Sequence, residues 1–362
     1  MAAMMHELKV MHPERDCRCY LLIDRPSRQA ALIDPRFDDV RDYLGELQRY
    51  GLDLKFAVDT HTHADHLSGA DRLRNLTGCK VVMGRATKSR VADTRADDGQ
   101  VLPLGRTELR VLHTPGHTPD SICVVAGNQV FTGDTLFIGG AARTDFMGGD
   151  SGQLYDSFRK IEALGPDTQV WPGHDYNKKA SSSVARELQT NPLFMLKDRD
   201  EVRRRLDIKG QLPANMAEIL SFNTEAGLRE AQIVRGEDLW RLGTAGQDYT
   251  LLDVRYADEW AAARSAHAVH VPMPQVRERW AEIEKLPRPI VSVCRSGVRA
   301  TMVMMTARHA GDSDWLLLEG GMLAWQKAGL PMVCDCGAPE VIASGQAKGG
   351  SCAVGGGTCA AG

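Results

Sequence analysis

The most constraining feature of this chain is the run His-Thr-His-Ala-Asp-His at residues 61–66. It follows an apolar stretch with strand character at residues 54–59 and precedes a polar, helix-like segment at residues 67–76. A strand that ends in three imidazoles and one carboxylate directs several possible ligands to one place. Imidazole and carboxylate suit zinc, iron, manganese or nickel, so the run predicts a metal site without selecting the metal.

The bulk composition narrows the class of protein. A chain of 362 residues predicts about two domains, and 43% hydrophobic with 25% charged residues is ordinary globular material. The net charge of -3 predicts no binding to nucleic acid or to an acidic membrane, and no stretch approaches the roughly 20 apolar residues of a membrane span. Residues 1–7 lack the basic and apolar regions of an export signal, which predicts a cytoplasmic protein. The nine cysteines are odd in number, and their spacing does not resemble a disulfide framework.

The first part of the chain alternates short strands with helices. The sequence predicts a hairpin at residues 17–33, on which Cys17 and Cys19 share one face as packing residues, and a helix at residues 40–47. Further strands are expected at residues 80–83, 108–113, 121–126 and 129–132, and further helices at residues 153–164 and 182–189. Mixed strands with helices outside them predict a layered α/β sandwich.

A second alternating pattern begins near residue 233, after a charged connector that starts near residue 191. Residues 249–254 and 289–293 are continuous apolar runs of the kind found in buried parallel strands. We therefore expect domains at residues 1–235, with a helical connector at the end of the first, and 236–333. A Gly/Cys-rich tail follows at residues 334–362; Cys334, Cys336, Cys352 and Cys359 there are left open as a sulfur relay, a soft-metal site or an unstructured end.

Three more candidate ligands follow expected strands of the first domain. His117 lies in the loop Thr-Pro-Gly-His-Thr-Pro, Asp134 ends the run Phe-Thr-Gly-Asp, and His174 lies in Trp-Pro-Gly-His-Asp-Tyr. In each case Gly or Pro lets the backbone turn at the strand end. Four such loops in one domain predict one shared metal centre.

These motifs resemble the metallo-β-lactamase fold, an αββα sandwich, and within that superfamily the persulfide dioxygenases. The resemblance rests on residues 60–66, 115–119, 131–134, 143–146 and 174–176, and it covers roughly residues 6–235. It implies one ferrous ion per chain, Fe(2+), held by His61, His117 and Asp134. Two imidazoles and one carboxylate leave open positions on iron, so that O2 and a substrate sulfur can bind side by side.

The resemblance also implies roles for residues around the iron. In the hydrolase branch of the superfamily the remaining candidates bind a second metal, whereas in the dioxygenases they orient the ligands through hydrogen bonds; they are His63, Asp65, His66 and His174. Arg143 and Tyr176 match positions that contact glutathione, and a guanidinium suits a carboxylate. The chain has Asp120 and Ala142 where that family more often has Gly.

A candidate sulfur site follows the apolar strand at residues 290–293. The sequence Cys-Arg-Ser-Gly-Val-Arg at residues 294–299 opens an expected helix, so backbone N–H groups and the helix dipole favour a thiolate at Cys294. Arg295 and Arg299 add positive charge. This part, roughly residues 233–333, resembles a rhodanese, an α/β sulfurtransferase domain with a parallel sheet, which implies that Cys294 carries sulfur as a persulfide.

Together the two resemblances imply a bifunctional enzyme of sulfur metabolism. Cys294 would move the outer sulfur between thiosulfate and glutathione, and the iron site would oxidise glutathione persulfide with O2 to sulfite and glutathione. One alternative is a thioester hydrolase with two metals, similar to glyoxalase II, fused to a sulfurtransferase. Another is a sulfur carrier whose first domain is not catalytic. The persulfide carrier, the direction of sulfur transfer and any homo-oligomer are left open.

Overall fold

The computed structural model describes residues 6–145, 148–207, 215–225, 228 and 230–334. The chain divides into two compact units, Met1–Gly227 and Leu228–Gly362. Phe146 of the Arg-Thr-Asp-Phe motif and the three tail cysteines Cys336, Cys352 and Cys359 lie outside the described residues. The domain boundary expected at residue 235 stays a prediction. In the described part of the chain, no helix has the length and hydropathy that crossing a membrane requires.

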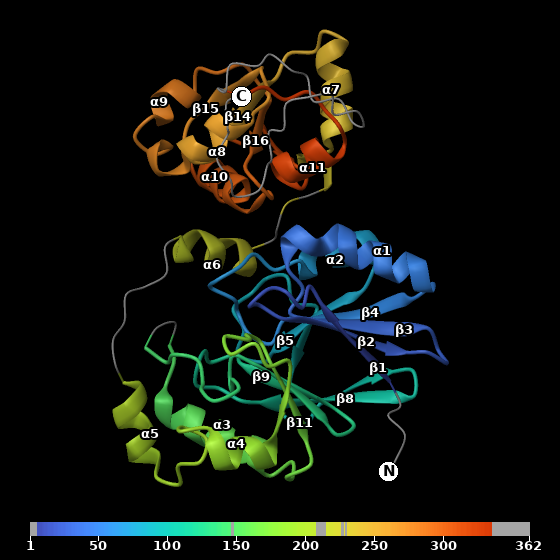
Figure 1. Ribbon diagram of the computed structural model, residues 1–362, viewed down its shortest axis with the longest axis vertical. Helices are drawn as coiled ribbons and strands as arrows, with labels where there is room; N and C mark the ends of the chain where they lie inside the picture. Colours follow the sequence, from blue (N-terminus) through green and yellow to red (C-terminus); the bar gives the residue numbers. More distant parts are fainter. Residues whose placement is uncertain (1–5, 146–147, 208–214, 226–227, 229, 335–362) are drawn as a thin grey trace, which may run out of the picture. The chain divides into compact units, whose positions relative to one another are not determined.

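Two six-stranded sheets form the centre of the first unit (Figure 1). The first sheet has the order β1-β2-β3-β4-β5-β6, with strands at Glu7–Met11, Cys19–Asp24, Gln29–Ile33, Asp53–Val58, Lys80–Gly84 and Thr94–Ala96. The second has the order β12-β11-β10-β9-β8-β7; in chain order from β7 its strands are Val101–Leu104, Thr107–His113, Ile122–Ala126, Gln129–Gly133, Gln169–Pro172 and Ser182–Ser183. Tyr20, Ile33, Val111 and Phe131 belong to one buried apolar cluster that joins the two sheets.

Helices cover the outer face of each sheet, which gives four layers (Figure 1). Helices α1 (Val40–Tyr50) and α2 (Ala70–Thr77) pack on the first sheet through a second apolar cluster. Helices α3 (Ser151–Glu162) and α4 (Val184–Thr190) pack on the second sheet through a third. The unit ends with α5 (Arg199–Leu206) and α6 (Met216–Thr224). The expected αββα sandwich is confirmed.

Local sequence explains where α1 begins and ends. Val40, Tyr43 and Leu47 recur at helical spacing and are buried against the sheet. The helix ends at Gly51, whose φ of 59° lies in the left-handed region that glycine adopts without steric cost. The amide of Leu52 then donates to the carbonyl of Leu47 at 2.8 Å, so the turn satisfies carbonyls that the helix leaves open.

Two expectations about secondary structure need correction. The helix expected from residue 182 begins at Val184, because Ser182–Ser183 first pairs as β12 and the Ser183 side chain then accepts from the amide of Arg186. Cys17 was expected on a strand beside Cys19, but β2 begins at Cys19. Residue 17 instead pairs with His174 in an isolated antiparallel bridge.

The second unit is built on one parallel sheet with the order β13-β17-β16-β14-β15. Its strands in chain order are Ile233–Val234, Thr250–Asp253, Ala268–His270, Ile290–Val293 and Trp315–Leu318. Its α-helices α7 to α11 are Gly236–Thr244, Ala257–Ala262, Trp280–Ile283, Val298–His309 and Gly321–Lys327. Leu251, Val291 and Trp325 belong to its buried core. The expected α/β domain with a parallel sheet is confirmed. Short 3-10 helices complete the described elements at Phe37–Asp39, Glu230–Gln232 and Met273–Gln275.

Candidate metal centre and sulfur-transfer loop

Strand ends and short loops of the first unit bring the candidate metal ligands together. Residues 59–69, here called the metal loop, follow β4 and carry His61. His117 lies between β8 and β9, and Asp134 comes directly after β10. All three side chains are buried. Because each of these segments ends near the same edge of the sandwich, residues separated by 73 positions in the sequence share one site.

His61, His117 and Asp134 have the geometry of a ligand set for one metal ion. Nε2 of His61 lies 3.9 Å and Nε2 of His117 lies 3.8 Å from Oδ2 of Asp134. One ligand atom from each of the three residues lies within 4.8 Å of the other two. Metal bonds to imidazole and carboxylate are about 2.0–2.2 Å, so one ion can lie between atoms at these separations.

Hydrogen bonds on the far side of each imidazole direct its Nε2 lone pair to this point. Nδ1 of His117 lies 2.7 Å from the carbonyl of Arg143, which can only accept, so Nδ1 carries the proton. Nδ1 of His61 lies 3.0 Å from the hydroxyl of Thr60. This hydroxyl donates its hydrogen bond to Oδ2 of Asp34 at 2.9 Å. Nε2 of His61 is buried and has no hydrogen-bond partner. These observations fit a metal ligand set.

The charges in the site also suit metal binding. Burial and the neighbouring imidazole of His63 lower the pKa of His61 to about 3, so the ring is neutral and its lone pair is available. Burial disfavours the charged form of Asp134, but the imidazole of His174 outweighs this effect and holds the pKa of Asp134 well below its usual range. A neutral imidazole and an ionised carboxylate are the protonation states that bind metal.

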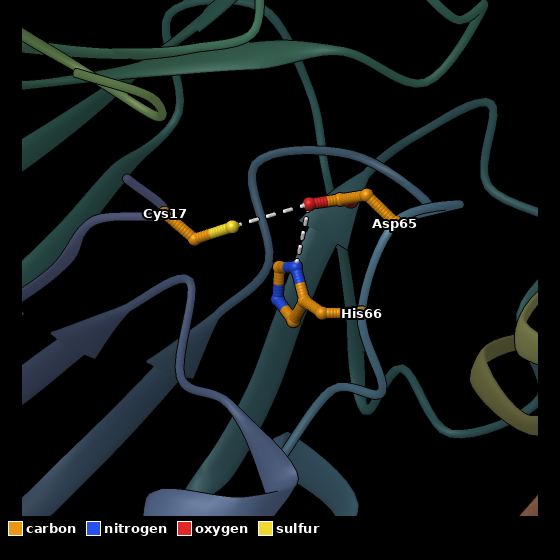
Figure 2. Close-up of side chains that lie close together, drawn as sticks. All are labelled: Cys17, Asp65 and His66. Atoms are coloured by element: carbon orange, nitrogen blue, oxygen red, sulfur yellow. Dashed lines mark hydrogen bonds and ion pairs between the residues drawn. The ribbon is translucent and has the colours of Figure 1, made fainter. Parts of the chain in front are cut away.

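The four other candidates contact one another around this centre. Nδ1 of His174 lies 2.9 Å from Asp134 Oδ1, and its Nε2 lies 3.1 Å from Asp65 Oδ2. Nδ1 of His66 also lies 3.1 Å from Asp65 Oδ2. Sγ of Cys17 lies 3.5 Å from the same oxygen and 3.4 Å from His174 Nε2 (Figure 2 shows Cys17, Asp65 and His66). His174 therefore links Asp134 to Asp65, and the structure brings all these residues to one place.

His63 makes a separate contact within the metal loop. Its Nε2 lies 3.1 Å from Asp34 Oδ1. Burial disfavours the charged imidazole, but the carboxylates of Asp34 and Asp59 outweigh burial and raise the pKa of His63 to about 10. The ring of His63 lies 4.2 Å from that of His61, so this charge sits next to the ligand set.

Two residues that hold the loops carrying the metal ligands were not identified as functional from the sequence. Asn223 of α6 is buried, and its amide donates to the carbonyls of His63 at 2.9 Å and His66 at 2.8 Å and accepts from the amide of Ser68 at 2.8 Å. No motif contains this asparagine, so its role is visible only in the folded chain. The second residue is Asp120, which the sequence marks only as a departure from the family.

Asp120 connects the two loops that carry the imidazole ligands. Its buried carboxylate accepts from Thr62 Oγ1 at 2.6 Å and from Thr118 Oγ1 at 2.7 Å. Thr62 follows His61, and Thr118 follows His117. One carboxylate therefore fixes the distance between the backbones of both loops, which is the arrangement that outer hydrogen-bond partners of a metal site provide.

A cavity of about 320 Å³ lies over the ligand set, and Arg143 and Tyr176 line it together with His117 and Asp134. The guanidinium of Arg143 makes two hydrogen bonds to the carboxylate of Asp145, at 2.6 and 2.7 Å. The ring of Tyr176 stacks on that of His174 with centroids 5.3 Å apart, and 64% of the tyrosine is exposed. Both residues expected to contact substrate thus lie at the cavity.

The candidate sulfur site lies in the second unit between β16 and α10. Cys294 is buried, and the amide of Gly297 donates to its Sγ at 3.2 Å. Arg299 makes a two-fold contact with Glu259 at 2.6 and 2.8 Å, whereas Arg295 is exposed. At the start of α11 the amides of Met322 and Leu323 donate to the carbonyls of Cys294 and Arg295. Main-chain hydrogen bonds from the start of α11 therefore hold this loop in place.

Known proteins match both units. Residues 12–174 match the metallo-beta-lactamase superfamily, and residues 237–328 match the rhodanese-like domain. The human mitochondrial persulfide dioxygenase ETHE1 is 37% identical over 214 residues, which cover 58% of this chain and 82% of the human protein. The crystal structure of ETHE1 from Myxococcus xanthus has 34% sequence identity and a TM-score of 0.58, and it covers 60% of this chain and 98% of that chain.

A third comparison concerns the fold alone. The crystal structure of a metallo-beta-lactamase from Staphylococcus aureus has a TM-score of 0.59 at 20% identity and covers 87% of this chain and 99% of that chain. Together with the buried imidazole and carboxylate ligand set, these likenesses imply a bound metal and small-molecule substrates. The chain is an enzyme of sulfur metabolism: it belongs to the persulfide dioxygenases of the metallo-beta-lactamase superfamily and carries a rhodanese-like domain after the metal-binding unit.

Proposed function

We propose that this enzyme binds one Fe(2+) per chain at His61, His117 and Asp134 and oxidises glutathione persulfide with O2. The observation that carries the proposal is the convergence of two imidazole Nε2 atoms and one carboxylate oxygen within 4.8 Å, at the end of a cavity. When bound there, ferrous iron would supply a place for O2 and the persulfide sulfur to meet and would activate O2. We assign this activity to residues 1–235 and sulfur transfer to residues 236–333.

The residues of the chain would prepare the site for this reaction. Asp134 is held by His174, and the two imidazoles are held by Thr60 and by the carbonyl of Arg143, so the ligand atoms are fixed before substrate enters. Arg143 would receive a carboxylate of glutathione. Its pairing with Asp145 already orients the guanidinium at the cavity, and the exposed Tyr176 would add a hydroxyl donor.

The overall reaction is balanced without a further reductant. Glutathione persulfide, O2 and one water give glutathione, sulfite and two protons. The outer sulfur loses four electrons, and O2 gains them. The water and the released protons exchange with solvent through the cavity over the ligand set.

We propose that the second unit makes or consumes the same persulfide. The Cys294 thiolate would attack the outer sulfur of thiosulfate, which releases sulfite and forms a Cys294 persulfide. Transfer of that sulfur to glutathione would regenerate the thiolate and give glutathione persulfide. The amide of Gly297, which already donates to Sγ, would stabilise the negative sulfur, and Arg295 and Arg299 would attract the anionic donor.

The first test is O2 uptake by iron-loaded protein given glutathione persulfide, with sulfite measured in the same samples. We expect one sulfite for each O2 consumed. Asp134→Asn keeps the size of the side chain but removes its charge, so it should lose iron and O2 uptake together. If the wild type holds iron and hydrolyses glutathione thioesters without consuming O2, the proposal is wrong and the hydrolase alternative is correct.

A further inference from the structure

The positive charge at the end of the sulfur loop, residues 294–299, is neutralised by a neighbouring carboxylate. The guanidinium of Arg299 donates to both carboxylate oxygens of Glu259, at 2.6 and 2.8 Å. The two side chains are only 19% and 23% exposed, so water screens this pair less than it screens an exposed one. The hydrogen bond from Arg299 lowers the pKa of Glu259, and the same bond raises the pKa of Arg299. Both partners are therefore ionised at neutral pH.

Glu259 is held in position by its own helix. It lies in the first turn of α8, and its Oε2 accepts from the amide of Tyr256 at 3.2 Å, which satisfies a main-chain donor at the start of that helix. The ring of Tyr256 also contacts the arginine, because Cζ of Arg299 lies 5.0 Å from the ring centroid. The start of α8 thus holds Arg299 through a carboxylate and an aromatic ring.

A second arginine near the sulfur loop is neutralised in a similar way. Asp253, at the end of β14, pairs in register with the residue that precedes Cys294. The buried carboxylate of Asp253 accepts from the guanidinium of Arg255 at 2.6 and 2.9 Å. Arg295 is exposed, so water and salt screen its charge. The less exposed arginines Arg255 and Arg299 are therefore each paired with a carboxylate.

We propose that Glu259 is a specificity-determining residue of the sulfur site, which weakens the binding of small inorganic sulfur anions at Cys294 by neutralising Arg299. The inference rests on the proposed function, in which thiosulfate enters this site and sulfite leaves it. Arg299 still attracts such an anion, but less strongly than an unpaired guanidinium does.

Weaker binding of sulfite has a chemical advantage in this site. Sulfite that stays beside the Cys294 persulfide can attack its outer sulfur, which forms a new S–S bond in thiosulfate and releases the Cys294 thiolate. That reaction reverses the first step of sulfur transfer. A site that releases sulfite readily leaves the persulfide free to react with an organic thiol instead.

The reaction of Cys294 with two alkylating reagents measures the local charge. Iodoacetate is an anion and iodoacetamide is neutral, so the ratio of their rates reports the electrostatic potential, whereas a change in thiol reactivity affects both. The full chain is reduced, and alkylation is followed on the peptide that contains Cys294. Glu259→Gln keeps an acceptor for the amide of Tyr256 and should raise the ratio about 3-fold, because two unit charges several ångströms apart in water interact by roughly RT. The rise should disappear at about 1 M salt, where the Debye length is about 3 Å.

Asp312→Asn is the matched control. Arg288 and Asp312 form an ion pair at 2.7 Å, with 27% and 21% of their side chains exposed. Arg288 precedes β16 whereas Cys294 follows it, so this pair lies at the other end of the strand and the ratio should keep its wild-type value. The double variant Glu259→Gln/Arg299→Gln restores the charge balance and should return the ratio close to that of the wild type.

Sulfur transfer from thiosulfate to glutathione gives the functional measurement. In Glu259→Gln the KM for thiosulfate should fall roughly 3–10-fold, and inhibition by sulfite should strengthen by a similar factor. A higher KM with a lower kcat would assign Glu259 a structural role and overturn the proposal, as would an unchanged alkylation ratio in Glu259→Gln or an equal rise in Asp312→Asn. If the ratio rises as expected but the wild type transfers no sulfur from thiosulfate, the proposed function of the second unit fails, while the effect of Glu259 on the charge at Cys294 stands.

Discussion

The side chain of Asn223 makes three hydrogen bonds to the metal loop. Its partners are the carbonyls of His63 and His66 and the amide of Ser68. Since the asparagine is buried, water cannot replace it when it is removed. At the scale of single residues, the metal loop is therefore held in place by a side chain that is not a candidate metal ligand.

Asn223→Ala should lower the free energy of unfolding of the first unit by about 2–4 kcal/mol, because three buried backbone groups lose their partner. Urea unfolding of the iron-free protein measures this change. The matched control is Asn177→Ala, which removes one bond to the carbonyl of Ile138 at an exposed position and should cost less than about 1 kcal/mol. Equal losses in the two variants would contradict the role given to Asn223.

Asp120→Ala should weaken iron binding about 10–100-fold, because Thr62 and Thr118 lose the carboxylate that joins their loops. Competition with a ferrous chelator measures the affinity. Asp120→Asn keeps one oxygen acceptor and should recover part of the loss. Wild-type affinity in Asp120→Ala would mean that the two ligand loops are positioned by other contacts.

At the scale of elements, the start of α11 determines the shape of the sulfur loop. A Cβ on Gly321 would lie 2.4 Å from the carbonyl oxygen of Cys294 and 2.6 Å from that of Arg295. Only glycine permits this approach, and the φ of 58° at this position also favours it. The helix can therefore donate its first amides to the loop that carries the thiol.

Gly321→Ala should lower the rate of sulfur transfer from thiosulfate to glutathione by at least about 10-fold and leave persulfide oxidation unchanged, since a shift of about 1 Å at a reacting group costs roughly 100-fold. Gly311→Ala is the matched control. Gly311 has a φ of 86° but no atom within 4 Å of an added Cβ, so this variant has the backbone strain without the collision. A similar loss in both variants would assign the effect to backbone strain alone.

At the scale of the whole molecule, each unit has its own buried core and its own reactive group. Among the described residues, the three apolar clusters given above for the first unit consist of residues of that unit, and the cluster around Trp325 consists of residues of the second. We therefore expect that each of the two proposed activities can be removed without the other. Their connection would be the persulfide that both sites use.

With thiosulfate and glutathione as the only substrates, O2 uptake should require both sites. Cys294→Ser and Asp134→Asn should each abolish it, and an equimolar mixture of the two variants should restore it, because glutathione persulfide can diffuse between molecules. Oxygen electrode traces with added glutathione persulfide serve as the control, since Cys294→Ser should then remain active. O2 uptake from thiosulfate and glutathione by either variant alone would contradict the proposal that the two sites act one after the other.

The sequence predicted the parts of the site that are marked by local patterns. His61, His117, Asp134 and His174 all follow strands, the last three at turns that contain Gly or Pro, so their convergence could be expected, and the structure brings them together. The fold class followed from the same alternation of strands and helices. Asn223 and Cys17 could not be found in this way. Asn223 contacts the carbonyl of His66 and Cys17 contacts His174, in each case 157 positions away, and no periodicity predicts such a pairing.

The contact between Asn223 and the metal loop has a consequence for biosynthesis. The carbonyl of His66 is translated 157 residues before the side chain that binds it. At translation rates of roughly 5–20 residues per second, the loop spends about 8–30 s without that partner. The metal loop of a nascent chain is therefore completed only when α6 leaves the ribosome, and expression fragments that end before residue 223 will contain all the proposed iron ligands, with His61 in a loop that lacks this support.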